Sequence, residues 1–318
     1  MAHELEMIDG KGQMAYAGDV PWHGLGVQVP SDLTPQQMLE AAGLDWEVEK
    51  IPTYTRINGV ETALSKSALV RKSDNKVLDV VSDDWNPVQN SEAFEFFNDF
   101  IANSEMEMHT AGSLKGGTIV WALAKIKDSF ELFGGDRVDS YLHFTNFHKY
   151  GFSTDVRFTP IRVVCNNTLT LSLNSKVERM VKIDHRRQFN GDSVKLMLGF
   201  AQEKLNKYKE MATFLGSKRA KNEDIVEFFK RVLPAGNPAK RETNLSRAAK
   251  IGMGILETQP GAEFAEGSWW PVFNSVTYMT DHLLGRSQDT RLTSAWYGAN
   301  RDLKLRALTE AVKMAETV

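Results

Sequence analysis

The chemically most versatile residues of this chain lie in one segment, Thr159–Asn174, which reads TPIRVVCNNTLTLSLN. It contains the only cysteine, Cys165, together with Arg162 and the adjacent amides Asn166 and Asn167. A cysteine beside a histidine base could act as a nucleophile. Nothing in the spacing places any of the seven histidines beside Cys165, and two valines precede it. A buried structural cysteine is therefore the favoured interpretation.

Acidic pairs could instead hold a divalent metal ion. Asp83 and Asp84 fall in a predicted turn, and Glu105 and Glu107 share one face of a predicted strand. No E-x-K or D-x-D arrangement accompanies them, and the chain has no H-E-x-x-H motif and no cysteine pair for zinc. Walker and G-x-G-x-x-G motifs are also missing from the sequence. The sequence predicts no catalytic residues, no metal site and no cofactor.

Basic and aromatic residues around the same segment favour nucleic-acid binding. Lys182, Arg186 and Arg187 form a compact basic cluster, while Lys149 stands beside Tyr150 at a predicted strand turn. Single-stranded DNA is usually held by cations along its phosphates and by aromatic faces on which bases stack. The competing interpretation is that lysine-rich helices are simply solvated. The candidate binding residues are Lys149, Tyr150, Phe152, Arg162, Lys182, Arg186 and Arg187.

Charge is distributed unevenly along the 318 residues. Residues 1–175 contain 14 Lys and Arg against 24 Asp and Glu, whereas residues 176–250 contain 18 against 9. A basic segment within an acidic protein can be a footprint for phosphates. No apolar run approaches the roughly 20 residues that span a bilayer, and the N-terminus lacks a signal-peptide pattern. With a single cysteine, we expect a soluble cytoplasmic protein without membrane association.

The first 175 residues are typical of hairpins and short helices. Thr34 and Gln37 predict a capping box that opens a helix ending at Gly43. A second helix is expected to have its N-terminal cap near Asn90 or Ser91 and to carry a phenylalanine stripe. Strands are predicted over residues 46–56, 63–70, 76–81, 105–110, 118–126, 141–147 and 153–158, with hairpin connections at 71–75, 112–117 and 148–151. Pro52 favours an edge position for the first of these strands.

Helical periodicity dominates after residue 192. Pro160 is expected to begin a helix or a tight turn with Arg162 in its first turn, and the alternation of leucines after Asn167 leaves helix and strand open there. Helices are predicted over residues 194–215, 222–233, 244–256, 268–285 and within 293–318, with Asn222 capping the second. The predicted fold class is α+β. An α+β domain with an antiparallel sheet covers 1–175, and a helical region covers 176–318, basic at 176–250.

Several segments resemble a family of phage- and plasmid-borne proteins catalogued as a domain of unknown function. They are Pro21–Gly26, Trp85–Asn90, Thr159–Leu169, which carries the TPxRVVCxNTL pattern, and Asn274–His282. The similarity follows the right order over most of the chain. Where the family commonly shows His-Asp-Gly, this chain has His148-Lys149-Tyr150-Gly151. That departure weakens a catalytic role for an acidic residue at the turn.

The resemblance implies a mobile-element setting such as recombination but no settled activity. By analogy with oligomeric single-strand annealing proteins, we expect binding to single-stranded DNA, ATP-independent strand annealing and a homo-oligomer. An enzyme is the less favoured class. Two alternatives stay open: a metal- or cysteine-dependent hydrolase, and a phage protein that binds a host factor through its acidic half.

Overall fold

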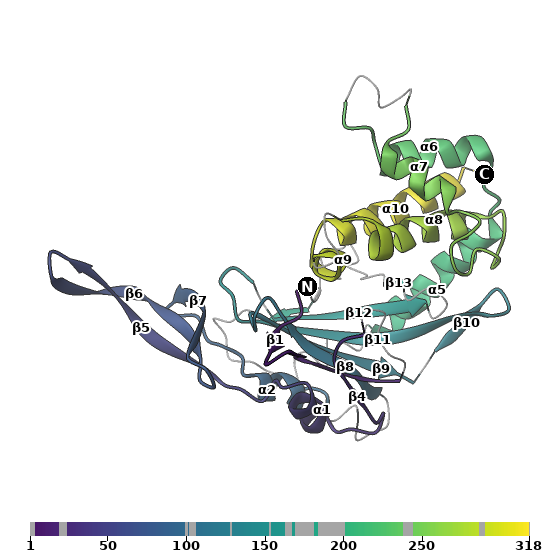
Figure 1. Cartoon of the computed structure of the whole chain (residues 1–318). Coiled ribbons are helices and arrows are strands. Elements are labelled where there is room, and N and C mark those ends of the chain that lie inside the picture. The colour runs from purple at the N-terminus through teal and green to yellow at the C-terminus, as the bar shows by residue number, and fades with distance from the viewer. Residues whose placement is uncertain are drawn as a thin grey trace. The chain divides into compact units, whose positions relative to one another are not determined.

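The computed structural model describes residues 4–18, 24–98, 101, 106–127, 129–152, 154–162, 167–168, 181–183, 201–237, 244–285 and 290–317. The chain divides into two compact units (Figure 1). Unit 1 combines Met1–Lys127, Tyr141–Arg157 and Leu173–Leu198, and unit 2 combines Asp128–Ser140, Phe158–Ser172 and Gly199–Val318. The predicted α+β class is confirmed. The predicted boundary between residues 175 and 176 lies outside the described residues.

A nine-stranded sheet has the main path β13-β12-β11-β9-β8-β3-β4. Its strands are β3 (Met14–Ala17), β4 (Val27–Val29), β8 (Met106–Leu114), β9 (Ile119–Ile126), β10 (Phe130–Leu132), β11 (Asp136–Phe147), β12 (Thr154–Arg162), β13 (Asn167–Thr168) and β14 (Val181–Ile183). Off the path, β10 pairs with β11 and β14 pairs with β12. A separate ladder joins β1 (Met7–Ile8) to β2 (Lys11–Gly12). The hairpins β8–β9 and β11–β12 agree with the sequence predictions.

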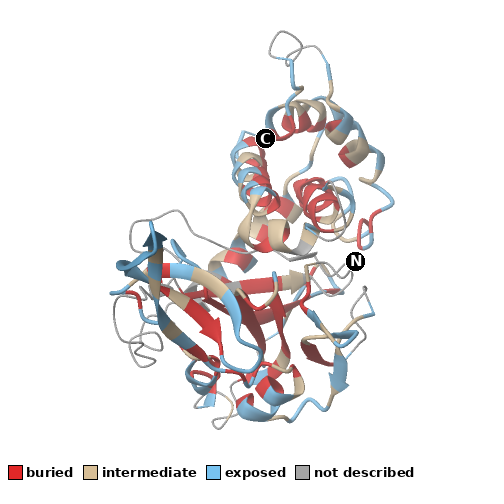
Figure 2. Ribbon diagram, turned by 60° about the vertical axis from the view of Figure 1, so that its left-hand side comes forward, coloured by how far each residue is buried: buried red, intermediate tan, exposed pale blue. Residues whose placement is uncertain are grey.

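A three-stranded sheet in unit 1 is formed by β5 (Val48–Ile57), β6 (Val60–Arg71) and β7 (Lys76–Ser82), with β6 in the centre. The three predicted strands and the edge position of Pro52 are confirmed. Asn58 and Gly59 have φ of 51° and 87°, the left-handed backbone that a tight two-residue hairpin turn requires. Figure 2 shows the large sheet mostly as buried residues, whereas most of β5 and the first half of β6 are exposed.

Two short helices belong to unit 1. Helix α1 (Pro35–Ala41) has the predicted capping box, because the Thr34 hydroxyl accepts a hydrogen bond from the Gln37 amide at 3.2 Å and the Gln37 side chain accepts one from the Thr34 amide at 2.9 Å. Helix α2 (Asn90–Glu95) is capped by Gln89, one residue earlier than predicted. Phe97, just after α2, packs edge-on against Phe144 of the sheet, with ring centroids 6.0 Å apart. The phenylalanine stripe therefore belongs to the core.

The predicted helix or tight turn at Pro160 is wrong, because β12 continues as a strand through Pro160 to Arg162. A proline disfavours helical backbone in the residue before it, and β-branched Thr159 and Ile161 suit an extended chain. Pairing of Ile161 with Thr168 completes the strand ladder. Similarly, β8 extends through Gly112 to Leu114, so the turn of the β8–β9 hairpin is shorter than predicted.

Unit 2 contains the helices α5 (Ala201–Ser217), α6 (Asn222–Val232), α7 (Arg247–Gly254), α8 (Trp269–Tyr278), the π-helical segment η2 (Met279–Leu283), α9 (Arg291–Tyr297) and α10 (Ala299–Ala315). Its core contains buried Trp269, Trp270 and Phe273 of α8, and the Trp270 indole donates to Asp136 at 2.8 Å. Asn222 is the first residue of α6 and Lys221 is its N-cap, which corrects the predicted cap. Among the described residues, no helix is long and apolar enough to span a bilayer.

Candidate nucleic-acid interface

The turn between β11 and β12 brings together three of the seven predicted binding residues. Tyr150 is 60% exposed and Phe152 is 45% exposed. The Lys149 ammonium lies 5.3 Å from the centroid of the Phe152 ring, which in turn stacks on Phe147 at 5.0 Å. The Tyr150 amide donates to the Asp79 carboxylate at 2.8 Å, which ties the turn to β7. A cation and two partly exposed aromatic side chains therefore share one anchored turn.

Buried polar side chains hold the strand ends that carry this turn. His148 Nε2 lies 3.0 Å from Asn90 Oδ1, and the Asn146 amide donates to the Val88 carbonyl at 2.7 Å. The Thr154 hydroxyl lies 3.3 Å from Asn146 Oδ1, so the first residue of β12 joins the same network. Buried polar groups that are hydrogen-bonded fix the backbone around them. The network positions the turn without facing solvent.

Sequence reasoning did not identify this supporting network. Its signal was present as polar residues at alternating positions, Asn146 near the end of β11 and His148 directly after it. Such residues share one face of a strand, and a polar pair on a buried face requires hydrogen-bonding partners. The partner Asn90 is 58 residues away in sequence, so its identity could not be read from local spacing.

The structure describes the other four predicted binding residues only in part or not at all. Arg162 ends β12, where its backbone pairs with Asn167, and Lys182 lies in β14 opposite Asp155; their side chains lie outside the description. Arg186 and Arg187 lie outside the described residues, as do Cys165 and Asn166. The structure thus brings Lys149, Tyr150 and Phe152 together and leaves the basic cluster as a prediction.

Lysines on α5 and just after it partly cover apolar rings. The Lys209 ammonium lies 5.7 Å from the centroid of Phe130, and that of Lys218 lies 5.7 Å from the centroid of Phe214. Long lysine stems commonly pack along aromatic surface while the charge remains in water. The lysine content of this part of unit 2 therefore does not by itself indicate phosphate binding.

Several cations of the β5–β7 sheet already have carboxylate partners. Lys72 lies 2.6 Å from Glu47, and Arg56 lies 2.6 Å from Glu61. Cations paired in this way contribute less positive potential to the surface around them than unpaired ones. An interface at the β11–β12 turn would therefore depend more on stacking than on phosphate contacts from this sheet.

Among the residues that the structure describes, no three His, Cys, Asp or Glu side chains gather as a metal site. Asp83, which the sequence offered as half of an acidic pair, accepts a hydrogen bond from the Ser67 hydroxyl at 2.7 Å. That contact gives the carboxylate a structural role between β6 and the end of β7.

A second polar cluster of unit 1 is buried within the large sheet. His143 of β11 lies 3.2 Å from the Thr145 hydroxyl, and Arg157 and Asp155 of β12 form an ion pair. All four side chains are almost inaccessible. Burial, reinforced by the positive charge of Arg157, lowers the pKa of His143 to about 3. The imidazole is therefore neutral near neutral pH.

Replacing His143 with glutamine is expected to make the protein less sensitive to acid. An unfolded histidine titrates near pH 6.5, whereas the folded pKa is about 3, so the unfolded state binds the extra proton between these values. Stability therefore falls as pH falls below 6.5, by up to about 1.4 kcal/mol per pH unit from this group. Urea denaturation at pH 7, 6 and 5 should show that the unfolding free energy of His143→Gln depends less steeply on pH than that of the wild type.

Thr145→Val is the matched control, because it removes the hydroxyl beside the imidazole but keeps the titrating group. It should lower the unfolding free energy by about 1 kcal/mol at every pH and keep the wild-type slope. If the unfolding free energy of His143→Gln changed with pH as steeply as that of the wild type, the assignment of a buried neutral imidazole would be contradicted.

These features define an α+β protein that presents an anchored aromatic turn at one end of an antiparallel hairpin. Residues 77–296 match a family model described as a domain of unknown function, DUF932. The match covers more than half of the chain, and the chain belongs to that family. It begins within β7 and ends within α9, so it includes the β11–β12 turn. None of the curated proteins and none of the solved structures gives a significant match.

Proposed function

We propose that the protein binds single-stranded DNA and promotes annealing of complementary strands without nucleotide hydrolysis. The observation that carries the proposal is the exposed pair Tyr150 and Phe152 beside Lys149 on the anchored β11–β12 turn. Large aromatic side chains are usually buried, and their exposure on a fixed turn offers faces to a flat ligand. Bases in a single strand have such faces, whereas those in a duplex are stacked on one another.

The chemistry of the turn suits a base followed by its phosphate. A base stacked on Tyr150 would bring its backbone within reach of the Lys149 ammonium, which stands over the ring of Phe152 two residues further on; stacking on Phe152 itself would require that ammonium to move aside. Further phosphates would be held by Lys182, Arg186, Arg187 and Arg162, which remain sequence predictions. The proposed setting is recombination of a phage or another mobile element in the host cytoplasm, and the proposed working form is a homo-oligomer.

Binding is tested by fluorescence anisotropy of a labelled oligonucleotide at several salt concentrations. Tyr150→Ala should weaken single-strand binding by about 5- to 150-fold, the range that corresponds to losing one stacked base at 1–3 kcal/mol. The Arg186→Ala/Arg187→Ala variant should also reduce the slope of log affinity against log salt, by about 0.7 for each lost phosphate contact. Wild-type protein that fails to bind at low salt would contradict the proposal.

Tyr54→Ala is the matched control for the stacking contact. Tyr54 of β5 is 61% exposed, close to the value for Tyr150, and it belongs to the same unit. The control removes an equally accessible tyrosine away from the β11–β12 turn and should leave the affinity unchanged. Equal losses from both substitutions would indicate a nonspecific effect. Annealing is measured separately, as the rate at which complementary labelled strands pair without ATP.

A further inference from the structure

The far half of the β5–β6 hairpin exposes large apolar side chains. Ile57 is 62% exposed, Val60 is 66% exposed and Leu64 is 44% exposed. They surround the tight turn at Asn58-Gly59 and lie in the part of the hairpin that β7 does not reach, because β7 pairs with β6 only from Lys66 to Arg71. We call Thr53–Ser65 the hairpin tip.

The hairpin tip is a two-stranded ribbon, and no other strand among the residues that the structure describes pairs with either of its outer edges. Isolated two-stranded hairpins are marginally stable in water, and open edges are templates for further strand pairing. The outer edge of β5 is partly protected by Pro52 and Arg56, residue types that discourage pairing. The corresponding edge of β6, Val60–Ser65, contains no proline, lysine or arginine. The edge of β6 is therefore better able than the edge of β5 to pair with another strand.

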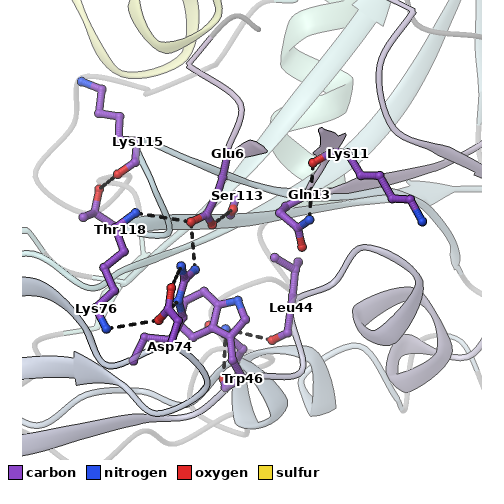
Figure 3. A network of polar contacts seen from close by, with 12 residues as sticks. Glu6, Lys11, Gln13, Leu44, Trp46, Asp74, Lys76, Ser113, Lys115 and Thr118 are labelled. Atoms are coloured by element: carbon purple, nitrogen blue, oxygen red, sulfur yellow. Dashed lines mark hydrogen bonds and ion pairs between the residues drawn. The ribbon is translucent and has the colours of Figure 1, made fainter. Parts of the chain in front are cut away.

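The other end of this sheet is firmly anchored (Figure 3). Arg71, the last residue of β6, donates to Glu6 at 2.9 Å, and Glu6 in turn accepts from Ser113 of β8 at 2.7 Å. The Arg71 and Glu6 side chains are both almost inaccessible. Anchoring at one end holds the strands together, so the tip can present a defined surface.

The two faces of the hairpin tip differ in charge. Residues directly opposite one another share a face, and the register pairs Ile57 with Val60, Arg56 with Glu61 and Thr55 with Thr62. Arg56 and Glu61 therefore occupy one face as an ion pair. The other face carries Thr55, Ile57, Val60 and Thr62 and has no charge, and Leu64 follows where the register with β5 shifts. An uncharged face beside an open edge is complementary to itself.

We propose that the hairpin tip binds a second copy of this chain, through antiparallel pairing of β6 with β6 of that copy about a two-fold axis. In a hairpin closed by a two-residue turn, Val60 and Thr62 point their backbone groups toward β5, and Glu61 and Ala63 point theirs outward. An axis at Thr62 pairs outward Glu61 with outward Ala63 of the second copy. The result is a continuous four-stranded sheet.

Side-chain chemistry favours this register over its neighbours. With the axis at Thr62, the count of residues places Val60 opposite Leu64 of the second copy, and no two like charges are opposed. Moving the axis to Glu61 would place two glutamates directly opposite, which is destabilising. Moving it to Ala63 would separate Val60 from Leu64 of the second copy. Self-pairing thus brings together apolar residues that are exposed in one copy.

A second copy is a better partner than an unrelated strand, because the edge and the uncharged face of one hairpin tip are complementary to the same edge and face of another. The family match begins at residue 77, after β5 and β6, so the contact belongs to a part of this chain outside the matched region. An interface of about ten residues a side is smaller than the standard interface of about 1,600 Å², which has about 20–30 residues a side, and such small contacts are weak and concentration-dependent.

The first test is sedimentation of the full chain without nucleic acid, which separates it from the DNA-binding proposal. The wild type should form dimers as its concentration rises through the micromolar range, and Val60→Lys should shift that transition at least tenfold higher. Tyr54→Lys places the same charge on the opposite face of the outer strand and should leave the transition in place. Wild type that remains monomeric at about 100 μM, well above a micromolar dissociation constant, would overturn the proposal.

The second test locates the contact by cross-linking. In a Cys165→Ser background, Thr62→Cys should form a disulfide-linked dimer under mild oxidation, because residues paired across the axis have Cα atoms about 4.5–5.5 Å apart. Thr55→Cys lies one strand farther out on the same face and should not cross-link. A dimer that persists in Val60→Lys, or that links through Thr55→Cys but not Thr62→Cys, would show that another surface joins the copies.

Discussion

Replacing Arg71 with methionine is expected to lower the free energy of unfolding by about 3–5 kcal/mol. The Arg71 guanidinium is 2% exposed and donates to Glu6 at 2.9 Å and to both oxygens of Asp74 at 2.9 and 2.6 Å. It also lies 5.1 Å from the centroid of the Trp46 ring. Methionine keeps much of the apolar volume but leaves the buried Glu6 carboxylate without its nearest cation.

Remaining contacts of Glu6 do not replace that cation. Ser113 donates one hydrogen bond to Glu6 at 2.7 Å, and the half-exposed Lys76 ammonium lies at 3.5 Å. Burying an ion without a close partner is strongly unfavourable, which is why removing one member of a buried pair costs more than the pair contributes. Urea denaturation should show the loss, and hydrogen exchange should assign it to the strands of unit 1.

Lys72→Met provides a control one residue away. Lys72 forms an ion pair of similar length, 2.6 Å to Glu47, but both side chains are more than half exposed. An exposed pair contributes about 0–1 kcal/mol, so the control should unfold close to wild type. The double variant Glu6→Gln/Arg71→Met should recover part of the loss because it removes the unpaired charge. A loss below 1 kcal/mol in Arg71→Met would show that water or Lys76 compensates Glu6.

Local signals predicted much of the fold. The capping box at Thr34 and Gln37 formed as expected, and strand alternation located β5, β6, β7 and the β11–β12 hairpin. Asn58-Gly59 is a similar local signal that could have placed the β5–β6 turn. Pro160 misled because proline is compatible with both a helix start and a strand near the edge of a sheet, and the choice depends on strand pairing such as that of Ile161 with Thr168.

The candidate site was predicted only in part, because local sequence signals reveal neighbours along the chain but not contacts between distant segments. Lys149, Tyr150 and Phe152 are neighbours in sequence, so a turn was enough to bring them together. The contacts that support them are not local: Asp79 is 71 residues from Tyr150, and Glu6 is 65 residues from Arg71. Composition also hides the difference between solvated and buried charges. Lys209 is exposed on α5 as its pattern suggests, whereas Lys304 of α10 is completely buried.

Replacing Lys304 with methionine is expected to destabilise unit 2 by about 3–5 kcal/mol. The Lys304 ammonium lies 2.7 Å from Asp281 Oδ1, and the exposed fractions of the two side chains are 0% and 7%. Burial lowers the pKa of Lys304, and the charge of Asp281 opposes that shift. Methionine fills a similar volume but removes the ammonium that lies 2.7 Å from the buried Asp281 carboxylate.

Asp281 lies in the π-helical segment η2, whose neighbouring Thr280 carbonyl accepts a hydrogen bond from Asn300 at 2.8 Å. The ion pair and this hydrogen bond both join η2 to the first turns of α10. Loss of the cation should therefore be seen as faster hydrogen exchange in η2 and in the start of α10. Lys313→Met, at an exposed position of the same helix, is the control and should change the unfolding free energy by less than about 0.5 kcal/mol.

The double variant Lys304→Met/Asp281→Leu separates a structural pair from a functional one. Replacing a buried pair by apolar residues of similar size is often neutral or stabilising by about 1–4 kcal/mol, so the double variant should be at least as stable as wild type. If it is stable and still binds and anneals DNA, the pair only joins the helices. If it is stable but inactive, the buried lysine takes part in function. A double variant less stable than Lys304→Met alone would contradict the account, because removing the buried carboxylate should relieve the single variant.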